Sequence, residues 1–299
     1  MNRFIIVTII AVALLGGAVY AYNFSKSRVP STVGEGHNME ETNTQPVAQS
    51  HRSYELEVTS DTTDIKPNQP VAISYKIKND KGEILKNYAV THEKIMHFIL
   101  VRKDLQQFQH LHPEFNQSTG EFSVQATFPT DGTYRIFPDF TPGDENPMKL
   151  PVTLNQDINV GDPSKFTPQQ VAMDSSPSKT VNGYAITYKL NPSQPMSQNE
   201  FTYTLSISRS GQPVTDLEPY LGALGHSVIL KEGTLDFIHT HAGEAASGSM
   251  NHGAMTTNNN SGPDISFSTT FPEGGKYKLF TQFQHQGKII TTDYTIQVK

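Results

Sequence analysis

A stretch that occurs twice decides the fold: residues 96–112 read MHFILVRKDLQQFQHLH, and residues 225–241 read GHSVILKEGTLDFIHTH. In both copies an apolar run is followed by a charged turn segment and then by a second short run, as in two strands joined by a hairpin. Because the two copies have the same internal spacing, they indicate that the chain contains one module twice.

The match between the halves extends beyond this stretch. Residues 128–140 and 271–283 share a Phe-Pro pair followed by Gly, Tyr and two Phe at matching positions. The offset changes only because the second half carries extra residues, rich in Gly, Ser, Met and Asn, between Ala242 and Pro263. A duplicated domain of roughly a hundred residues is the simplest account.

Alternation of large apolar residues with small or polar ones predicts strands in both halves. It occurs at residues 71–77, 122–128, 184–190, 201–207, 265–271 and 277–283. No amphipathic helix is predicted after the N-terminal stretch. The sequence therefore predicts an all-β fold: two tandem antiparallel sandwiches, immunoglobulin-like or cupredoxin-like, that follow an N-terminal apolar helix.

Composition sets the domain boundaries. Arg3 precedes an uncharged, mostly apolar stretch from Phe4 to Tyr22, which predicts a signal peptide or an N-terminal membrane anchor within residues 1–27. We therefore expect the rest of the chain to be exported, on the periplasmic or extracellular face, either released or tethered by one transmembrane helix. The predicted segments are a flexible linker (28–51), the first sandwich (52–162), a second linker (163–182) and the second sandwich (183–299), with a Met-, His- and Asn-rich loop at 242–263.

The composition excludes several classes of site. The 299 residues include no Cys, so disulfides, thiolate zinc fingers, iron–sulfur clusters, cysteine nucleophiles and blue-copper sites are all excluded. The net charge of −6 argues against a nucleic-acid partner. A metal ion, if bound, must be held by His, Met, Asp or Glu.

Histidines recur in both halves with the spacing H-x12-H-x-H. The first set is His97, His110 and His112, and the second is His226, His239 and His241. If each hairpin pairs its first His with its last, all three side chains share one face and can converge on a metal ion at about 2.0–2.1 Å per bond. A register slip of one residue would move the lone His to the other face. The alternative is that these histidines only tie loops to backbone carbonyls.

Apolar residues continue the face of each histidine set. They are Ile99, Val101 and Phe108 in the first half, and Val228, Leu230 and Phe237 in the second. We therefore expect each set to lie at one end of a surface that faces inward and is partly shielded from water. Unpartnered neutral imidazoles in such a place would be poorly satisfied.

Asp139 and Gln282 occupy matching places in the strand after the Gly-x-Tyr corner. Three interpretations of Asp139 remain open: it is a fourth metal ligand, it orients a histidine through the second ring nitrogen, or it is a solvent-facing strand residue. Gln282 is a poor ligand, so a fourth position would differ between the halves.

The loop of the second half adds candidate ligands. It contains Met250, His252 and Met255, and thioether together with imidazole favours Cu(I). We therefore expect copper, with zinc as the alternative metal. The opposing interpretation is a low-complexity spacer with accidental Met content.

These motifs carry a family resemblance. Residues 93–97, residues 108–114 and the Phe-Pro…Gly-x-Tyr-x-x-Phe corner resemble exported bacterial β-domain proteins, some of them grouped with YtkA-like domains. The resemblance covers roughly residues 70–140 and 200–299, and it implies export, a β-sandwich and copper handling, with the two histidine sets and Asp139 as ligands. The second half departs from the pattern at Ala242-Gly243 and Gln282, which puts its site in doubt.

The leading hypothesis is an exported, non-enzymatic copper-binding protein that sequesters the metal or passes it to another exported metal-handling protein. No general base is evident beside either histidine set, which weighs against the alternative of a His-ligated metalloenzyme. A β-sandwich module for adhesion or scaffolding, without metal, is the third hypothesis.

Overall fold

The computed structural model describes residues 53–143, 150–244 and 261–299. The N-terminal apolar stretch and the flexible linker expected before residue 52 lie outside these residues. Within the described ranges, no helix has the length and hydropathy of a membrane span.

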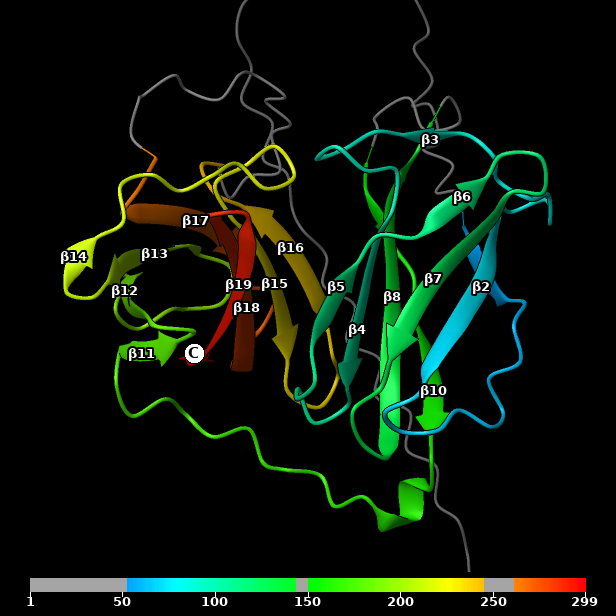
Figure 1. Cartoon of the computed structure of the whole chain (residues 1–299), viewed down its shortest axis with the longest axis horizontal. Helices are drawn as coiled ribbons and strands as arrows, with labels where there is room; N and C mark the ends of the chain where they lie inside the picture. Colours follow the sequence, from blue (N-terminus) through cyan, green and yellow to red (C-terminus); the bar gives the residue numbers. More distant parts are fainter. Residues whose placement is uncertain (1–52, 144–149, 245–260) are drawn as a thin grey trace, which may run out of the picture. The chain divides into compact units, whose positions relative to one another are not determined.

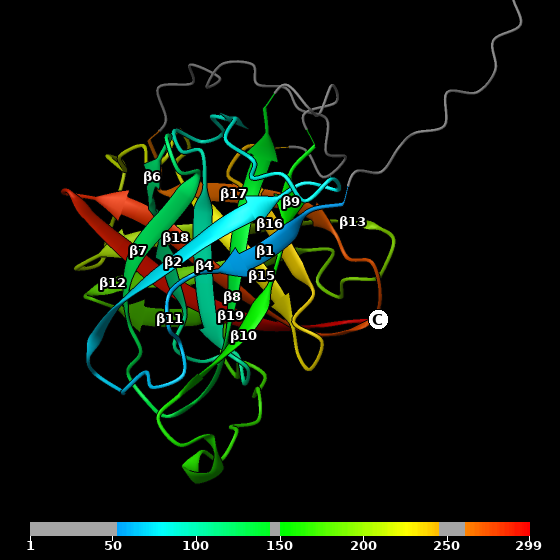
Figure 2. The ribbon, with the colours of Figure 1, turned by 90° about the vertical axis from the view of Figure 1, so that its right-hand side faces the viewer.

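The first half forms two antiparallel sheets, with strand orders β1-β2-β7-β6 and β10-β8-β4-β5, while β3 and β9 pair with β8. Figure 1 shows β2 beside β7 in one sheet and β4 beside β8 in the other, and Figure 2 shows β1 and β2 in front of β4 and β8. The strands are β1 (Glu55–Val58), β2 (Pro70–Lys78), β3 (Tyr88–Ala89), β4 (His97–Arg102), β5 (Gln109–Leu111), β6 (Glu114–Asn116), β7 (Glu121–Thr127), β8 (Gly132–Pro142), β9 (Val152–Thr153) and β10 (Gln156–Val160).

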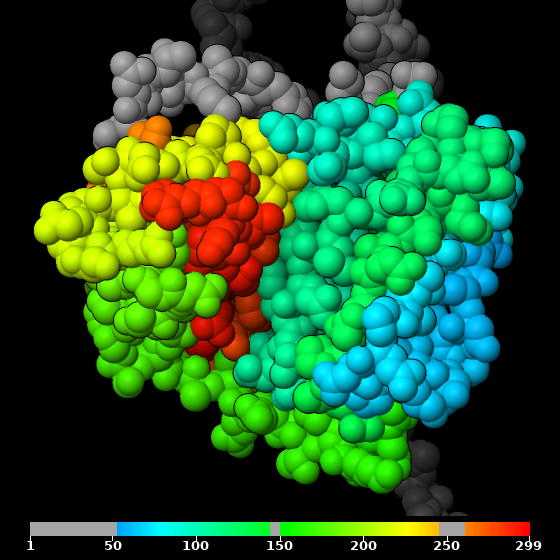
Figure 3. Space-filling model, in the orientation of Figure 1, coloured from blue at the N-terminus to red at the C-terminus, as the bar shows by residue number. Residues whose placement is uncertain are grey.

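The second half repeats this arrangement, with sheets ordered β11-β12-β13-β14, extended by β17 on β13, and β16-β15-β18-β19. In the space-filling view of Figure 3 the red C-terminal segment lies against yellow-green segments of the same half. The rings of Tyr188 in β12 and Tyr294 in β19 stack. The strands are β11 (Ser178–Val181), β12 (Tyr184–Asn191), β13 (Glu200–Arg209), β14 (Gln212–Pro213), β15 (His226–Lys231), β16 (Phe237–His241), β17 (Asp264–Thr270), β18 (Gly275–His285) and β19 (Lys288–Val298).

The all-β prediction and the tandem repeat are confirmed, and one segment differs from its predicted place. The range 163–182 was expected to be a linker throughout. It begins with the 3-10 helix η1 (Pro163–Lys165), but its last residues form β11, which pairs with β12 as part of the second sandwich. The alternation in 178–181 was too short to stand out from the polar residues around it.

Period-two alternation builds the core of each sandwich. In β7 the side chains of Phe122, Val124 and Ala126 are buried, while the residues between them are more exposed. In β12 the same holds for Tyr184 and Ile186. Burying one face in this way is what stabilises a sandwich of two sheets.

The repeated Phe-Pro…Gly-x-Tyr segment forms the same corner in both halves. Tyr134 packs edge-on against Phe128, and its hydroxyl donates to the carbonyl of Thr130 at 3.1 Å. In the second half Tyr277 donates to the carbonyl of Glu273 at 2.9 Å. A tyrosine bonded to backbone a few residues upstream is a feature of immunoglobulin-like sandwiches.

Strands β4 and β15 depart from alternation because both of their faces are buried. All six residues of β4 are buried, and so are residues 226–230 of β15. One face of β4 packs in its own sandwich through Phe98 and Leu100. The other face belongs to a separate apolar cluster described below, and the histidines lie on that face.

Candidate metal centre

The hairpin of β4 and β5 brings three histidines of the first half together. Ile99 pairs with His110 and Phe98 with Leu111, so the register places His112 beside His97. The rings of His97 and His112 have centroids 5.2 Å apart. We call His97, His110 and His112 the first triad; one ligand atom of each lies within 4.8 Å of the other two.

The hairpin of β15 and β16 does the same in the second half. His226 pairs with His241 and Val228 pairs with His239. His226, His239 and His241 form the second triad, whose ligand atoms also lie within 4.8 Å of one another. The register that the spacing required is therefore the one that the structure has.

The sequence predicted that the faces carrying the triads point inward. In the structure these faces point away from the cores of their own sandwiches. They pack against each other within the compact unit formed by residues 51–299. The shared apolar cluster contains Ile99, Val101, Leu105, Phe137, Val171, Val228, Leu230, Leu235 and Phe280, with Phe108 and Phe237 packed against it. The prediction was wrong because residues 98–101 of β4 and 228–230 of β15 are apolar on both faces of the strand, so alternation does not say which face turns inward.

Two aromatic pairs cross this interface in a repeated way. Phe108 of the first sandwich stacks on Phe280 of the second, with centroids 4.4 Å apart. Phe237 of the second stacks on Phe137 of the first at 5.2 Å. Phe108 and Phe237 are matching positions, and so are Phe137 and Phe280, so the two contacts are equivalent.

A tight turn holds the first histidine of each triad. His92-Glu93 and Leu221-Gly222 have positive φ at both positions, as the central pair of a type I′ turn requires. The carbonyl that opens each turn lies against a ring nitrogen: Thr91 O is 3.3 Å from His97 Nε2, and Tyr220 O is 2.8 Å from His226 Nε2. Both rings therefore direct Nδ1 toward the other histidines.

Asp139 and Gln282 each hold a histidine of the opposite sandwich. Asp139 pairs with His97 in the sheet, yet its Oδ2 accepts from His239 Nδ1 at 2.8 Å. Gln282 pairs with His226, and its Oε1 lies 2.8 Å from His110 Nδ1. Of the three interpretations of Asp139, the structure shows contact with a second ring nitrogen, and the side chain is only 10% exposed.

The cluster contains two further residues, Glu244 and His92, which comparison of the two halves of the sequence missed. Glu244 Oε2 accepts from His241 Nδ1 at 2.8 Å, and His92 stacks on His241 with ring centroids 3.4 Å apart. His92, His241 and Glu244 also lie close enough to form a third ligand group. Comparison of the halves could not find them because Leu221 replaces His92, and Glu244 follows a substituted Ala-Gly pair. The only available signal was the position of His92 in a tight turn.

Burial keeps most of these imidazoles neutral. It lowers the pKa of His97 to about 2 and that of His112 to about 4. Burial also lowers the pKa of His110, His226 and His241, and the neighbouring imidazoles lower it further, since like charges would repel. Neutral imidazole is the form that binds metal ions.

The second triad has three buried lone pairs that face no donor. Its rings meet a backbone carbonyl and two carboxylates, which only accept hydrogen bonds, so each ring carries its proton on that side. The remaining nitrogens, His226 Nδ1, His239 Nε2 and His241 Nε2, are buried and have no hydrogen-bond partner among the described residues. Three such lone pairs in one place match the three histidine ligands that hold the ion in three-histidine metal sites.

The first triad shows the same deficit in another form. His97 donates through Nε2 to Thr91, and Gln282 presents its amide oxygen to His110 because its Nε2 donates to Thr291 at 3.0 Å. Two nitrogen lone pairs, His97 Nδ1 and His110 Nε2, then face each other at 3.0 Å. Nitrogens that share one metal ion at 2.0–2.1 Å are roughly this far apart.

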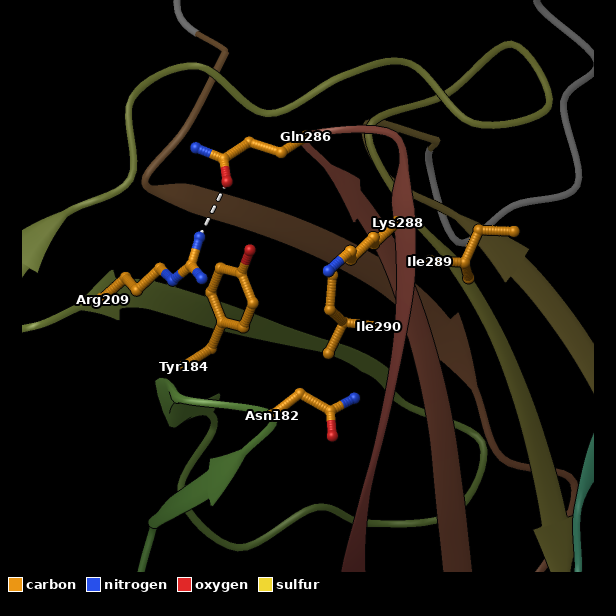
Figure 4. Close-up of a pocket in the computed structure, with 7 residues that line it drawn as sticks. All are labelled: Asn182, Tyr184, Arg209, Gln286, Lys288, Ile289 and Ile290. Carbon is orange, nitrogen blue, oxygen red and sulfur yellow. Dashed lines mark hydrogen bonds between the residues drawn. The ribbon is translucent and has the colours of Figure 1, made fainter.

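Three further candidate ligands come from the loop of the second half. Met250, His252 and Met255 lie outside the described residues. His285, a buried histidine of β18, belongs to neither triad, and its ring nitrogens bond to Tyr184 and Asp216. A surface pocket of the second sandwich, where Arg209 lies over the ring of Tyr184 and donates to Gln286, contains no residue of either triad (Figure 4).

Solved structures resemble the chain only weakly. An Escherichia coli adhesin, FdeC, is 14% identical, with 82% of this chain and 64% of that chain covered and a TM-score of 0.25. The elastase-activated and trypsin-activated forms of Escherichia coli alpha-2-macroglobulin are each 9% identical at the same TM-score of 0.25, with 82% of this chain covered and 20% and 15% of theirs. The chain spans less than two thirds of each, and these likenesses carry no argument about function.

No curated protein matches the chain. A family profile matches it twice, over residues 50–168 and 179–299, so each sandwich corresponds to one copy. The resemblance to YtkA-like domains is not confirmed by this match. Because the two copies cover most of the sequence, the chain belongs to the family described as "Domain of unknown function (DUF8832)".

Proposed function

We propose that the protein is an exported, non-enzymatic copper-binding protein that sequesters the metal or delivers it through its histidine triads. The observation that carries this proposal is the set of buried ring nitrogens in the second triad whose protons are fixed on the opposite side of each ring. A metal ion satisfies all three lone pairs at once.

A purely structural role for these histidines explains the geometry less well. A buried acceptor left without a partner costs about 1–3 kcal/mol. Such a cost recurs at His112 Nε2 in the first triad and at three nitrogens of the second. A module selected only for stability would be expected to place apolar side chains there.

The ligand types favour copper, with zinc as the alternative. All six triad residues offer imidazoles, which suit both metals, and copper binds more tightly than zinc to a given set of nitrogen donors. Met250, His252 and Met255 would add thioether and imidazole donors suited to Cu(I) from the loop.

The surroundings of the triads favour binding over catalysis. Both oxygens of Asp139 are occupied, Oδ2 by His239 and Oδ1 by the hydroxyl of Thr153 at 2.7 Å. Asp139 is therefore not free to act as a base toward the unpartnered ring nitrogens of the triads. The apolar stretch Phe4–Tyr22 supports export, and the partner would be another exported metal-handling protein.

Copper titration of the full chain tests the proposal. We expect bound copper that falls when His110 and His112, or His239 and His241, are replaced by Ala. The matched control is His285→Ala, which removes a buried histidine that belongs to neither triad. If the folded protein binds neither copper nor zinc, the proposal is wrong and a β-sandwich with a structural or adhesive role remains.

A further inference from the structure

The shortest ring separation between the two triads equals a separation within the first triad. The ring of His97 lies 5.3 Å from that of His110 in its own triad and 5.3 Å from that of His239 in the other. His110 is 5.8 Å from His239, and His226 is 6.3 Å from both His97 and His110. No apolar layer separates these rings.

Each triad has one histidine whose hydrogen-bond partner comes from the other sandwich. His239 depends on Asp139 of the first sandwich for its tautomer, and His110 depends on Gln282 of the second. Each supporting residue lies in the strand position next to the first histidine of its own triad, so it contacts both triads. A change in either residue therefore affects the environment of two groups of ligands.

The interface that joins the triads is rigid enough to fix their separation. Stacked pairs Phe108–Phe280 and Phe137–Phe237 pack beside them, and the surrounding aliphatic side chains are buried. Close packing of this kind leaves little room for relative movement. Asp139 and Glu244 supply the negative charge nearest to the rings, which offsets part of the repulsion between two bound cations.

From these observations we propose that the two triads form one dinuclear copper centre, each triad holding one ion, which the two sandwiches complete for each other. The proposal rests on the copper-binding function proposed above. It adds that the ions are neighbours and that each sandwich controls the site of the other. Two-metal sites of known enzymes hold their ions about 3.5–4 Å apart. Rings of the two triads that lie 5.3–6.3 Å apart are close enough for the ions to be neighbours.

Electron paramagnetic resonance of the full chain loaded with Cu(II) tests the pairing. We expect two bound ions per chain with magnetic coupling, seen as a half-field transition or as a spin count well below the copper content. His239→Ala/His241→Ala should leave one ion with a full, uncoupled signal. X-ray absorption should show copper–copper scattering in the intact protein and none in this variant.

Gln282→Ala tests the crossed support without removing a ligand. We expect copper affinity of the first triad to fall about 10- to 100-fold, the usual effect of losing a partner of a ligand. Gln284→Ala is the matched control on the same strand, since its side chain bonds to Glu218 and not to a triad. Circular dichroism confirms that each variant is folded.

The outcomes separate the two proposals. Two bound ions with full, uncoupled signals would overturn the dinuclear centre and leave copper binding intact, and so would a single bound ion per chain. Wild-type affinity of the first triad in folded Gln282→Ala would overturn the crossed support. Absence of both copper and zinc binding would overturn the function itself.

Discussion

The two triads share one spacing and one hairpin register, but different groups hold their rings. In the second triad, Asp139 and Glu244 place carboxylates on His239 and His241. In the first triad, the matching support for His110 is the neutral amide of Gln282. A carboxylate partner makes an imidazole a stronger donor than an amide does. The second triad, whose sequence departs from the pattern, is therefore the better prepared of the two to hold a metal ion.

The largest expected effect is acid destabilisation of the metal-free protein, to which both triads should contribute. In the unfolded chain a histidine has a pKa near 6.5, whereas His97 has a folded pKa of about 2. The unfolded state therefore binds more protons as pH falls below 6.5, and stability is lost through that range. His97 alone lowers the free energy of unfolding by about 2 kcal/mol at pH 5 relative to pH 7.

Chemical denaturation of the chelator-treated protein at pH 7 and pH 5 measures this effect. His97→Ala and His226→Ala should flatten the pH dependence by similar amounts, because both rings are almost fully buried. A flat profile in the unmodified protein would show that the histidines are not buried as neutral groups.

Asp139→Asn should have the next largest effect, on the second triad. An asparagine amide can donate to His239 Nδ1, which would move the ring proton to Nε2 and block the metal. We expect copper affinity of the second triad to fall about 100-fold, at the upper end of the effects of such partners. Competition with a copper chelator measures it, and Asp157→Asn, which disturbs only contacts with Arg135 and Lys103, is the control.

Gln282→Glu should reduce the difference between the triads. The new carboxylate would face His110 as Asp139 faces His239, and Thr291 would donate to it as Thr153 donates to Asp139. We expect the first triad to gain up to about tenfold in affinity, the lower end of the effects of partners. A loss of affinity would mean that carboxylate support does not explain why the triads differ.

His92→Ala should have the smallest effect. His92 stacks on His241 of the second triad and belongs to neither triad. We therefore expect a change of only a few-fold in copper affinity of the second triad, with a larger change in the rate at which a chelator removes the ion. Stopped-flow absorbance measures the rate, and an unchanged rate would assign His92 to packing.

The sequence predicted what depends on local pattern. The spacing of His97, His110 and His112 fixed a hairpin register, and β4 and β5 have it because charged and polar residues form the turn between apolar runs. The repeat, the strands and the burial of Phe122 or Ile186 follow from alternation in the same way. Asp139 was also singled out, since a carboxylate between Phe137 and Phe140 needs a partner.

The sequence could not predict the partner itself. His239 is a hundred residues away from Asp139, and docking of one sandwich on another leaves no periodic signal in either. Ile99 and Val101 look the same in sequence whether they pack inward or against a second domain. His92 and Glu244 were missed because their roles depend on that docking too.

Crossed contacts such as Phe108–Phe280 and Phe137–Phe237 have the form of an isologous interface, in which one patch meets its own copy. In a dimer of two identical subunits, both equivalent contacts across the interface must use the same residue. Covalent linkage of the copies removes that requirement, so Asp139 contacts a histidine of the opposite sandwich in one contact and Gln282 does so in the equivalent one. Tandem fusion thereby permits inequivalent neighbouring ions, which a symmetric homodimer of the same module would not have.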